Sequence, residues 1–177
     1  RLLEPLGLHP LWATAIIYAL SAAIIAAARP RAIGQLLRTP ALWVLVAASG
    51  TTNAAFNWAV VIGDVVRVIL LFYLMPLWSV LLARLLLHER LTATTGLRVG
   101  LALAGAAIVP WPAGRSGWEV LPLPRTLPDW LGLLGGFAFA LNNVMLRREA
   151  HRPEEGRALA MFVGGASVAA VLAAALA

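Results

Sequence analysis

The sequence predicts an all-α membrane protein, a multi-helix transmembrane bundle. Of its residues, 61% are hydrophobic and 12% are charged, whereas ordinary soluble domains carry about 25% charged residues. The apolar residues also form long runs, close to the length of about 20 residues that a helix needs to cross a bilayer core. Because backbone groups cannot stay unpaired in lipid, helices are favoured over an open sheet. A soluble fold of 177 residues could not hide so much apolar surface.

Six apolar segments are expected to span the membrane, with turn residues or arginines between them. They are His9–Ala28, Ala41–Ile62, Val65–Leu87, Leu91–Pro110, Asp129–Leu146 and Arg157–Ala177. The connections carry Arg29-Pro30, Gly63-Asp64, the Pro/Gly-rich segment 110–128 and Arg152-Pro153, which are residues that end helices. Segment 29–40 is therefore expected to be a loop.

The arginines are distributed unevenly along the chain. Segments 29–40, 84–98 and 147–157 hold ten of the 14 arginines, and the alternate connections hold four. Loops rich in arginine stay in the cytoplasm, so these three segments are predicted to be cytoplasmic. On this topology the first residues lie outside, and we expect an earlier helix to precede them. The arginines lie between apolar runs rather than along one face, which argues against a nucleic-acid partner.

Residues 64–109 carry a specific pattern. A helix with Pro76 inside "YLMPLW" ends in "LLLHERLT" and is followed by the Gly-rich "GLRVGLALAGAAIV". This pattern resembles the EamA-type transporters of the drug/metabolite transporter superfamily, and "ALNNVMLRRE" (140–149) is similar to the start of that family's second repeat. The resemblance implies ten helices in two inverted five-helix repeats around a central pathway.

On the family's pattern, this chain would hold helices two to seven of ten. Residues 1–110 would form most of the first repeat with four helices, 111–128 an outer loop, and 129–177 the start of the second repeat. An inverted repeat is also suggested by "ALSAAIIAAA" (19–28) and "ASVAAVLAAA" (166–175), although an Ala-rich chain produces such likeness by chance.

The resemblance implies a transporter of the bacterial inner membrane. Its substrate would be a small organic metabolite, amino acid or drug, moved by alternating access and, as in many members, outward. The expected partners are that substrate and the lipid bilayer. A non-transporting membrane scaffold or partner subunit is the alternative function.

The residues do not indicate an enzyme, a cofactor or a metal. The chain has no cysteine, and His88-Glu89 lacks the second histidine of a zinc helix because position 92 is Thr. Ser79 has no evident catalytic base, and no histidine lies in the middle of a span.

Polar residues inside the apolar segments are the candidates for a substrate pathway: Asn53, Asn57, Tyr73, Pro76 and Asn142. Asn53 and Asn57 are spaced i, i+4 on one helix. Amides inside a membrane are costly unless they bond across helices or line a wet cavity, so helix–helix hydrogen bonding is the alternative. Pro76 cannot donate to the Phe72 carbonyl and predicts a kink, which is either a hinge or a static feature.

Charged residues near the ends of the Pro76 helix are candidates for gate or interfacial ion pairs: Asp64 and Arg67 at one end, and Arg84, Glu89 and Arg90 at the other. Simple alternatives are a helix-start acid with a snorkelling arginine, and an interfacial anchor. Gly96, Gly100 and Gly105 predict close helix packing and are compatible with a homodimer.

Overall fold

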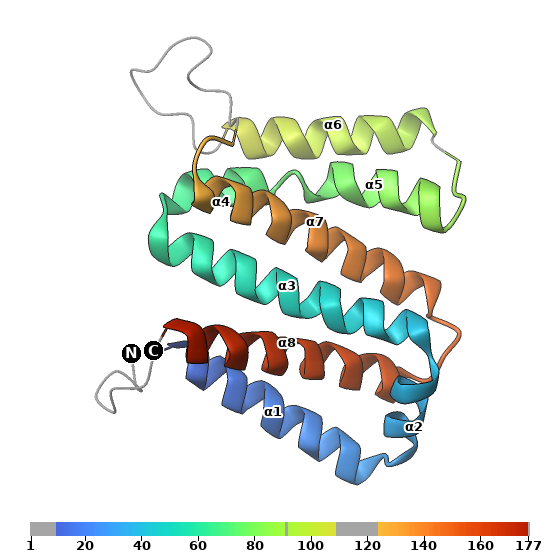
Figure 1. Cartoon of the computed structure of the whole chain (residues 1–177). Coiled ribbons are helices and arrows are strands. Elements are labelled where there is room, and N and C mark those ends of the chain that lie inside the picture. The colour runs from blue at the N-terminus through green and yellow to red at the C-terminus, as the bar shows by residue number, and fades with distance from the viewer. Residues whose placement is uncertain (1–9, 91, 109–123, 177) are drawn as a thin grey trace. The chain divides into compact units, whose positions relative to one another are not determined.

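The computed structural model describes residues 10–90, 92–108 and 124–176, which form helices and short connections (Figure 1). The helices are α1 (Pro10–Ala28), α2 (Arg31–Arg38), α3 (Pro40–Ile62), α4 (Val65–Phe72), α5 (Met75–Leu86), α6 (Ala93–Ile108), α7 (Leu127–Arg148) and α8 (Glu154–Leu176). The described residues are thus helical, as the sequence predicts. Most of the expected loop 111–128 lies outside them, but its last residues belong to α7, which begins two residues before Asp129.

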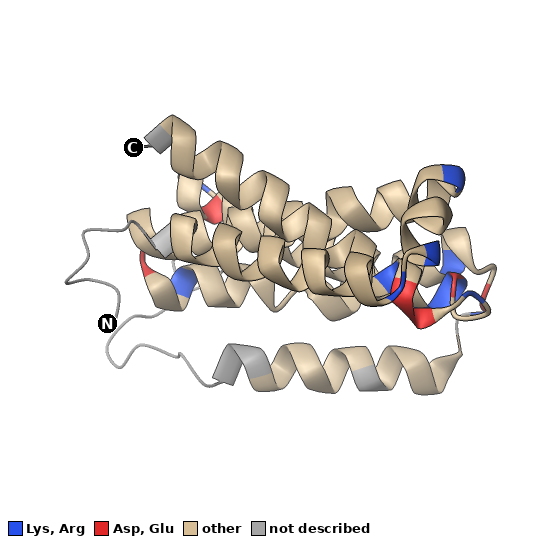
Figure 2. Ribbon diagram, turned by 90° about the horizontal axis from the view of Figure 1, so that it is seen from below, with Lys and Arg blue, Asp and Glu red and all other residues tan. Residues whose placement is uncertain are grey.

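The chain divides into two compact units. The first consists of residues 1–54 together with 145–177, and the second of residues 55–144. Helices α3 and α7 each contribute residues to both units. In both units the charged residues that Figure 2 colours lie near helix ends and in connections. This distribution is the one that a bilayer core imposes, because ionised groups are costly inside hydrocarbon.

Among the described residues, four helical segments are long and apolar enough to cross a membrane. They are Pro40–Ile62, Val65–Leu86, Leu127–Arg148 and Glu154–Ala175. A fifth is reached if α1 and α2, which are bent by 110° at their junction, count as one span. The described part of α6 has 16 residues and is about 24 Å long, short of a full crossing. The described residues thus support four or five of the six expected spans.

Segment 29–40 is not the loop that the sequence analysis expects, because residues 31–38 form α2. Ala32 and Leu36, which lie one turn apart on α2, are buried. Their burial stabilises the helix, because a helix of eight residues is not stable through its intrinsic propensity alone. Helix α2 ends before Thr39-Pro40, where Thr39 is extended as a residue preceding proline prefers. Pro40 then begins α3, a position where its missing N–H costs nothing.

In the first unit, α8 packs along α1 and also contacts α2 (Figure 1). Helices α8 and α3 approach each other closely at two glycines, Gly164 on α8 and Gly50 on α3. A Cβ on Gly50 would stand 2.6 Å from the carbonyl oxygen of Gly164, and a Cβ on Gly164 would collide with the carbonyl of Val46. Helix backbones in membranes pack this closely only where side chains are absent.

In the second unit, α7 packs against α4 through two glycines one turn apart. A Cβ on Gly132 would stand 3.0 Å from the Val68 carbonyl oxygen, and one on Gly136 would stand 2.6 Å from the Phe72 carbonyl oxygen. Phe72 also contacts two aromatic rings, those of Phe56 and Phe139, at centroid distances of 4.8 and 5.6 Å. These contacts hold the end of α4 against α3 and α7.

Candidate functional site

A chain of polar contacts joins three helices of the first unit. The hydroxyl of Tyr18 on α1 donates to Oδ1 of Asn53 on α3 at 3.2 Å. Nδ2 of Asn53 donates to the carbonyl of Ser49 at 3.0 Å, and the Ser49 hydroxyl donates to the Met161 carbonyl on α8 at 3.0 Å. These groups lie within otherwise apolar helices, so each hydrogen bond offsets a desolvation cost.

Glycine and aromatic packing position Tyr18 for this contact. Its ring meets that of Phe162 edge to face, with centroids 5.7 Å apart. The ring also lies on Gly165, where a Cβ would collide with it. The tyrosine therefore fits between α1 and α8 because position 165 has no side chain. Its hydroxyl and the Asn53 amide keep unused hydrogen-bonding capacity, since each can still accept or donate a further bond.

Asn53 and Asn57 differ in environment although they share one face of α3. Asn53 is partly buried and bonded as described, whereas Asn57 is exposed. Asn57 belongs to the second unit. The described structure therefore links Asn53, and not Asn57, to a hydrogen-bonded neighbour on another helix.

The helix containing Pro76 is interrupted rather than merely bent. Helix α4 ends at Phe72 and α5 begins at Met75, with Tyr73 and Leu74 between them (Figure 1). Pro76 stands in the first turn of α5, where a missing N–H is tolerated. The Leu77 and Trp78 amides both donate to the Leu74 carbonyl. Tyr73 is 45% exposed at this break, so its phenol is accessible from outside the second unit.

Asn142 and Asn143 are adjacent on α7, and their side chains have different environments. Asn143 Nδ2 donates to the Phe139 carbonyl of its own helix at 2.9 Å. Asn142 is 6% exposed, and its Oδ1 is buried without a hydrogen-bond partner among the described residues. Nε1 of Trp78, whose ring packs edge to face on Phe137, is likewise buried without an acceptor there. A buried orphan acceptor is costly and can bind a donor.

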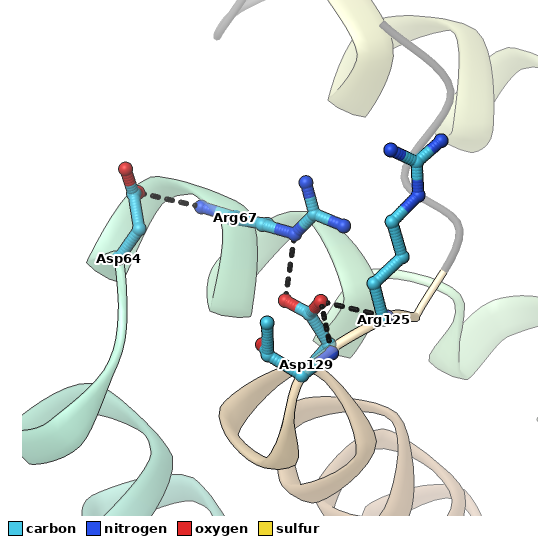
Figure 3. Close-up of polar contacts among 5 residues, drawn as sticks. Asp64, Arg67, Arg125 and Asp129 are labelled. Carbon is cyan, nitrogen blue, oxygen red and sulfur yellow. Dashed lines mark hydrogen bonds and ion pairs between the residues drawn. The ribbon is translucent and has the colours of Figure 1, made fainter. Parts of the chain in front are cut away.

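An ion pair joins the first turns of α4 and α7 (Figure 3). Asp64 caps α4 by accepting from the backbone amide of Arg67 at 3.1 Å. The Arg67 guanidinium points away from Asp64 and pairs with Asp129, Nε to Oδ1, at 2.7 Å. The second oxygen of Asp129 accepts from the backbone amides of Arg125 and Thr126, and the residue is 1% exposed.

Local sequence explains how Asp129 is held. Thr126 precedes α7 and Asp129 stands three residues later, the spacing of a capping box, in which the acid accepts from the backbone amide of the cap residue. The helix N-terminus also favours a negative charge. Neither Asp129 nor Tyr18 is among the site residues that the sequence predicts. The Thr-x-x-Asp spacing was a usable signal for Asp129, whereas nothing near Tyr18 in the sequence marks its partner 35 residues away.

The other predicted residues lie at the surface. Arg84, Glu89 and Arg90 are exposed at the end of α5 and just after it, where His88 adopts a positive φ of 54°. Gly96, Gly100 and Gly105 are exposed, and a Cβ on any of them would meet no described atom within 4 Å. Their predicted role in packing therefore involves no contact within the described part of the chain.

Chemically, these groups offer hydroxyl and amide hydrogen bonds within apolar helices, and charge only near helix ends. Within residues 10–90, 92–108 and 124–176, no three His, Asp or Glu side chains gather as a metal site would require. Hydroxyl and amide groups of this kind can form hydrogen bonds with polar groups that carry no net charge.

Comparison with known proteins identifies relatives of this chain. Residues 4–111 match the sequence profile of the EamA-like transporter family. An uncharacterized transporter of Pseudomonas aeruginosa is 38% identical over 96 residues, which are 52% of this chain and 32% of the relative. The match thus spans about a third of the relative's length. No solved structure matches the chain.

Proposed function

The chain belongs to the EamA-like transporter family, and from this we propose that it moves a small organic metabolite, amino acid or drug across the bacterial inner membrane by alternating access, in the outward direction. The chain is a multi-pass membrane protein, and its residues 1–110 and 129–177 would belong to the two inverted repeats of such a transporter. Residues 111–128 would form the outer loop between them.

The polar contacts of Tyr18, Asn53 and Ser49 are the observation that carries this proposal. If these groups served helix packing alone, one hydrogen bond for each would be enough. The hydroxyl of Tyr18 and the amide of Asn53 can each form a further hydrogen bond in addition to those described. We assign Asn53 and Asn57 on α3, with Asn142 on α7, to the substrate pathway. The last assignment is supported by Oδ1 of Asn142, which has no hydrogen-bond partner among the described residues.

The break between α4 and α5 would serve as the hinge of the pathway. Because Pro76 has no amide to donate to the Phe72 carbonyl, one helical hydrogen bond is missing at the break, and discontinuous helices are common at transport sites. Tyr73 and Pro76 are assigned to the pathway on this ground. Asp64, Arg67 and Asp129 would close the outer end of the unit, and Arg84, Glu89 and Arg90 the inner end.

The distribution of arginines supports one orientation. The segments 29–40, 84–98 and 147–157 would face the cytoplasm, because they hold ten of the 14 arginines. The Asp64 end of α4 would then face outward.

Transport is tested in proteoliposomes that contain the intact protein. The vesicles are loaded with the twenty isotope-labelled amino acids and with ethidium, and their release is followed by mass spectrometry and fluorescence. At least one probe is expected to leave faster than it does from protein-free vesicles. Asn53→Leu and Asn57→Leu are expected to reduce that rate at least tenfold while the amount of inserted protein stays the same.

Val61→Leu is the matched control, since Val61 is exposed on the same helix and makes no polar contact. It should transport like the unaltered protein. Equal release from protein and protein-free vesicles for every probe would contradict the transport proposal and favour a scaffold. Unchanged transport by Asn57→Leu would remove that residue from the pathway.

A further inference from the structure

Helix α2 leaves α1 at a sharp angle. Helix α1 has 19 residues and is about 28 Å long, close to the thickness of a bilayer core. By length alone α1 can thus cross most of the core without α2, so the two helices need not form one broken span. The 110° bend between the two helices turns α2 to within about 20° of the perpendicular to α1. If α1 has the average membrane-helix tilt of about 20°, α2 lies within about 40° of the membrane plane, nearer to that plane than to its normal.

The side chains of α2 divide into three sectors around the helix. Ala32 and Leu36 are buried against the rest of the first unit. At about 100° per residue, the next sector holds Ile33 and Leu37, which are 43% and 66% exposed. The remaining side holds Arg31 and Arg38, both exposed. An apolar strip that no part of the described chain covers thus runs beside a basic strip on one short helix.

Packing fixes the rotation of α2 about its own axis. Gly156, near the start of α8, is buried against the side chain of Gln35, and a Cβ at this position would collide with Gln35. Together with Ala32 and Leu36, this contact prevents α2 from turning its exposed apolar residues into the unit. Ile33 and Leu37 therefore remain outside it, where lipid is the apolar medium available to a multi-pass membrane protein.

The charge around α2 has one dominant sign. Segment 29–40 contains three arginines and no acid. The Arg29 residue between α1 and α2 is exposed like Arg31 and Arg38. Glu154 and Glu155 open α8 beside Gly156, where the start of the helix favours negative charge. The three arginines outnumber these two acids, and arginine matches phosphate geometry particularly well.

We propose that α2 is an interfacial helix that binds anionic phospholipid, with Ile33 and Leu37 among the acyl chains and with Arg29, Arg31 and Arg38 on the headgroup phosphates. Amphipathic helices bind membrane surfaces by this combination of apolar burial and basic charge. The lipid would hold α1 and the start of α8 at a defined depth in the leaflet. None of these five residues belongs to the proposed substrate pathway.

The depth of α2 provides the first test. The chain has no cysteine, so single spin labels can be placed on the intact protein without altering other sites. Labels at Ile33→Cys and Gly34→Cys are compared in mixed phosphatidylcholine and phosphatidylglycerol vesicles. Gly34 tolerates a label, because a Cβ there meets nothing within 4 Å. Relaxation by oxygen and by a water-soluble nickel complex should place the label at 33 deeper than the one at 34. Equal depth, the reverse order, or full exposure of both labels to water would overturn the proposal.

The headgroup contact provides the second test. Spin-labelled phosphatidylglycerol should associate with the intact protein more strongly than spin-labelled phosphatidylcholine, and Arg31→Gln with Arg38→Gln should reduce this preference by about fivefold for each arginine. Arg84→Gln with Arg90→Gln removes the same charge from exposed positions at the end of α5 and is the matched control. An equal loss in both double variants, or no loss in the first, would show that α2 does not bind anionic lipid selectively.

Discussion

Gly136 on α7 lies against the carbonyl oxygen of Phe72, the acceptor that Pro76 leaves without its helical donor. A Cβ at position 136 would stand 2.6 Å from that oxygen and 3.2 Å from the Phe72 carbonyl carbon. The break in the α4–α5 helix is therefore matched by a missing side chain on its neighbour. Such an approach also permits a weak Cα–H···O contact with this oxygen, which lacks the amide donor that a non-proline residue at position 76 would supply.

Gly136→Ala is expected to destabilise the protein by about 1–3 kcal/mol, because the added methyl group must displace backbone rather than a flexible side chain. Gly100→Ala is the control, since a Cβ there meets no described atom within 4 Å and alanine raises helix propensity by up to about 1 kcal/mol. The free energy of unfolding of both variants is measured in bilayer-like micelles by titration with a denaturing detergent. Equal changes in the unfolding free energy of the two variants would show that the close approach of Gly136 to Phe72 does not limit packing.

Pro76→Ala is expected to lengthen the α4–α5 segment. Alanine restores the amide that can donate to the Phe72 carbonyl and removes the clash of the proline ring. Val66 and Leu85 are exposed, and spin labels on cysteines at these positions would lie about 28 Å apart along one continuous helix. The distance measured by pulsed electron resonance should increase toward this value in the variant. An unchanged distance would mean that packing around Phe72, rather than Pro76, keeps the helix broken.

Arg67→Gln is expected to cost more stability than Asp129→Asn. Removing the guanidinium leaves a carboxylate that is 1% exposed without its counter-charge, a loss of about 3 kcal/mol. Removing the carboxylate's charge leaves an arginine whose side chain is 34% exposed and can reach water, and asparagine can still accept from the amides of residues 125 and 126. We expect about 1 kcal/mol for that loss.

The double variant completes this comparison of Arg67 and Asp129. Its loss of unfolding free energy should be smaller than the sum of the two single losses, because both remove one interaction. Asp64→Ala provides a contrast, since it removes only a helix cap and should cost about 1 kcal/mol. Additive losses at 67 and 129 would indicate that the ion pair contributes nothing net.

Tyr18→Phe is expected to keep the edge-to-face contact with Phe162 while losing the hydrogen bond to Asn53. The stability cost should be about 0.6 kcal/mol, the average for such bonds between membrane helices. Transport of any probe identified in proteoliposomes should fall much more than this small cost explains, since the hydroxyl orients Asn53, which is assigned to the pathway. A variant that transports normally would assign the Tyr18–Asn53 bond to helix packing alone.

Much of the fold could be predicted because it depends on local properties of the chain. The ends of α1, α3 and α8 lie within a few residues of the predicted ends, because Pro, Gly and charged residues terminate apolar runs in the sequence itself. The interruption at Pro76 follows equally from the chemistry of one residue. Helix α2 was missed because its stability depends on burying Ala32 and Leu36, a contact that eight residues alone do not reveal.

The candidate site was less predictable. Asn53, Asn142 and the Pro76 break could be selected because polar groups in apolar runs are visible without a structure. Their partners could not, because a helix that is apolar on all sides gives no signal of which face meets which neighbour. Gly96, Gly100 and Gly105 illustrate this, since they have the spacing of a packing motif but face away from the described chain.

The sequence by itself determined that this is a multi-pass helical membrane protein of the EamA-like family, since run length, composition and motif are linear properties. Tertiary structure decided that Arg67 pairs with Asp129, 62 residues away, rather than with Asp64 three residues away. It also decided that Tyr18 reaches Asn53 and that Gly132, Gly136 and Gly164 are the close-packing glycines. The physical reason is that side-chain partners depend on helix rotation and neighbour choice, which only the packed chain specifies.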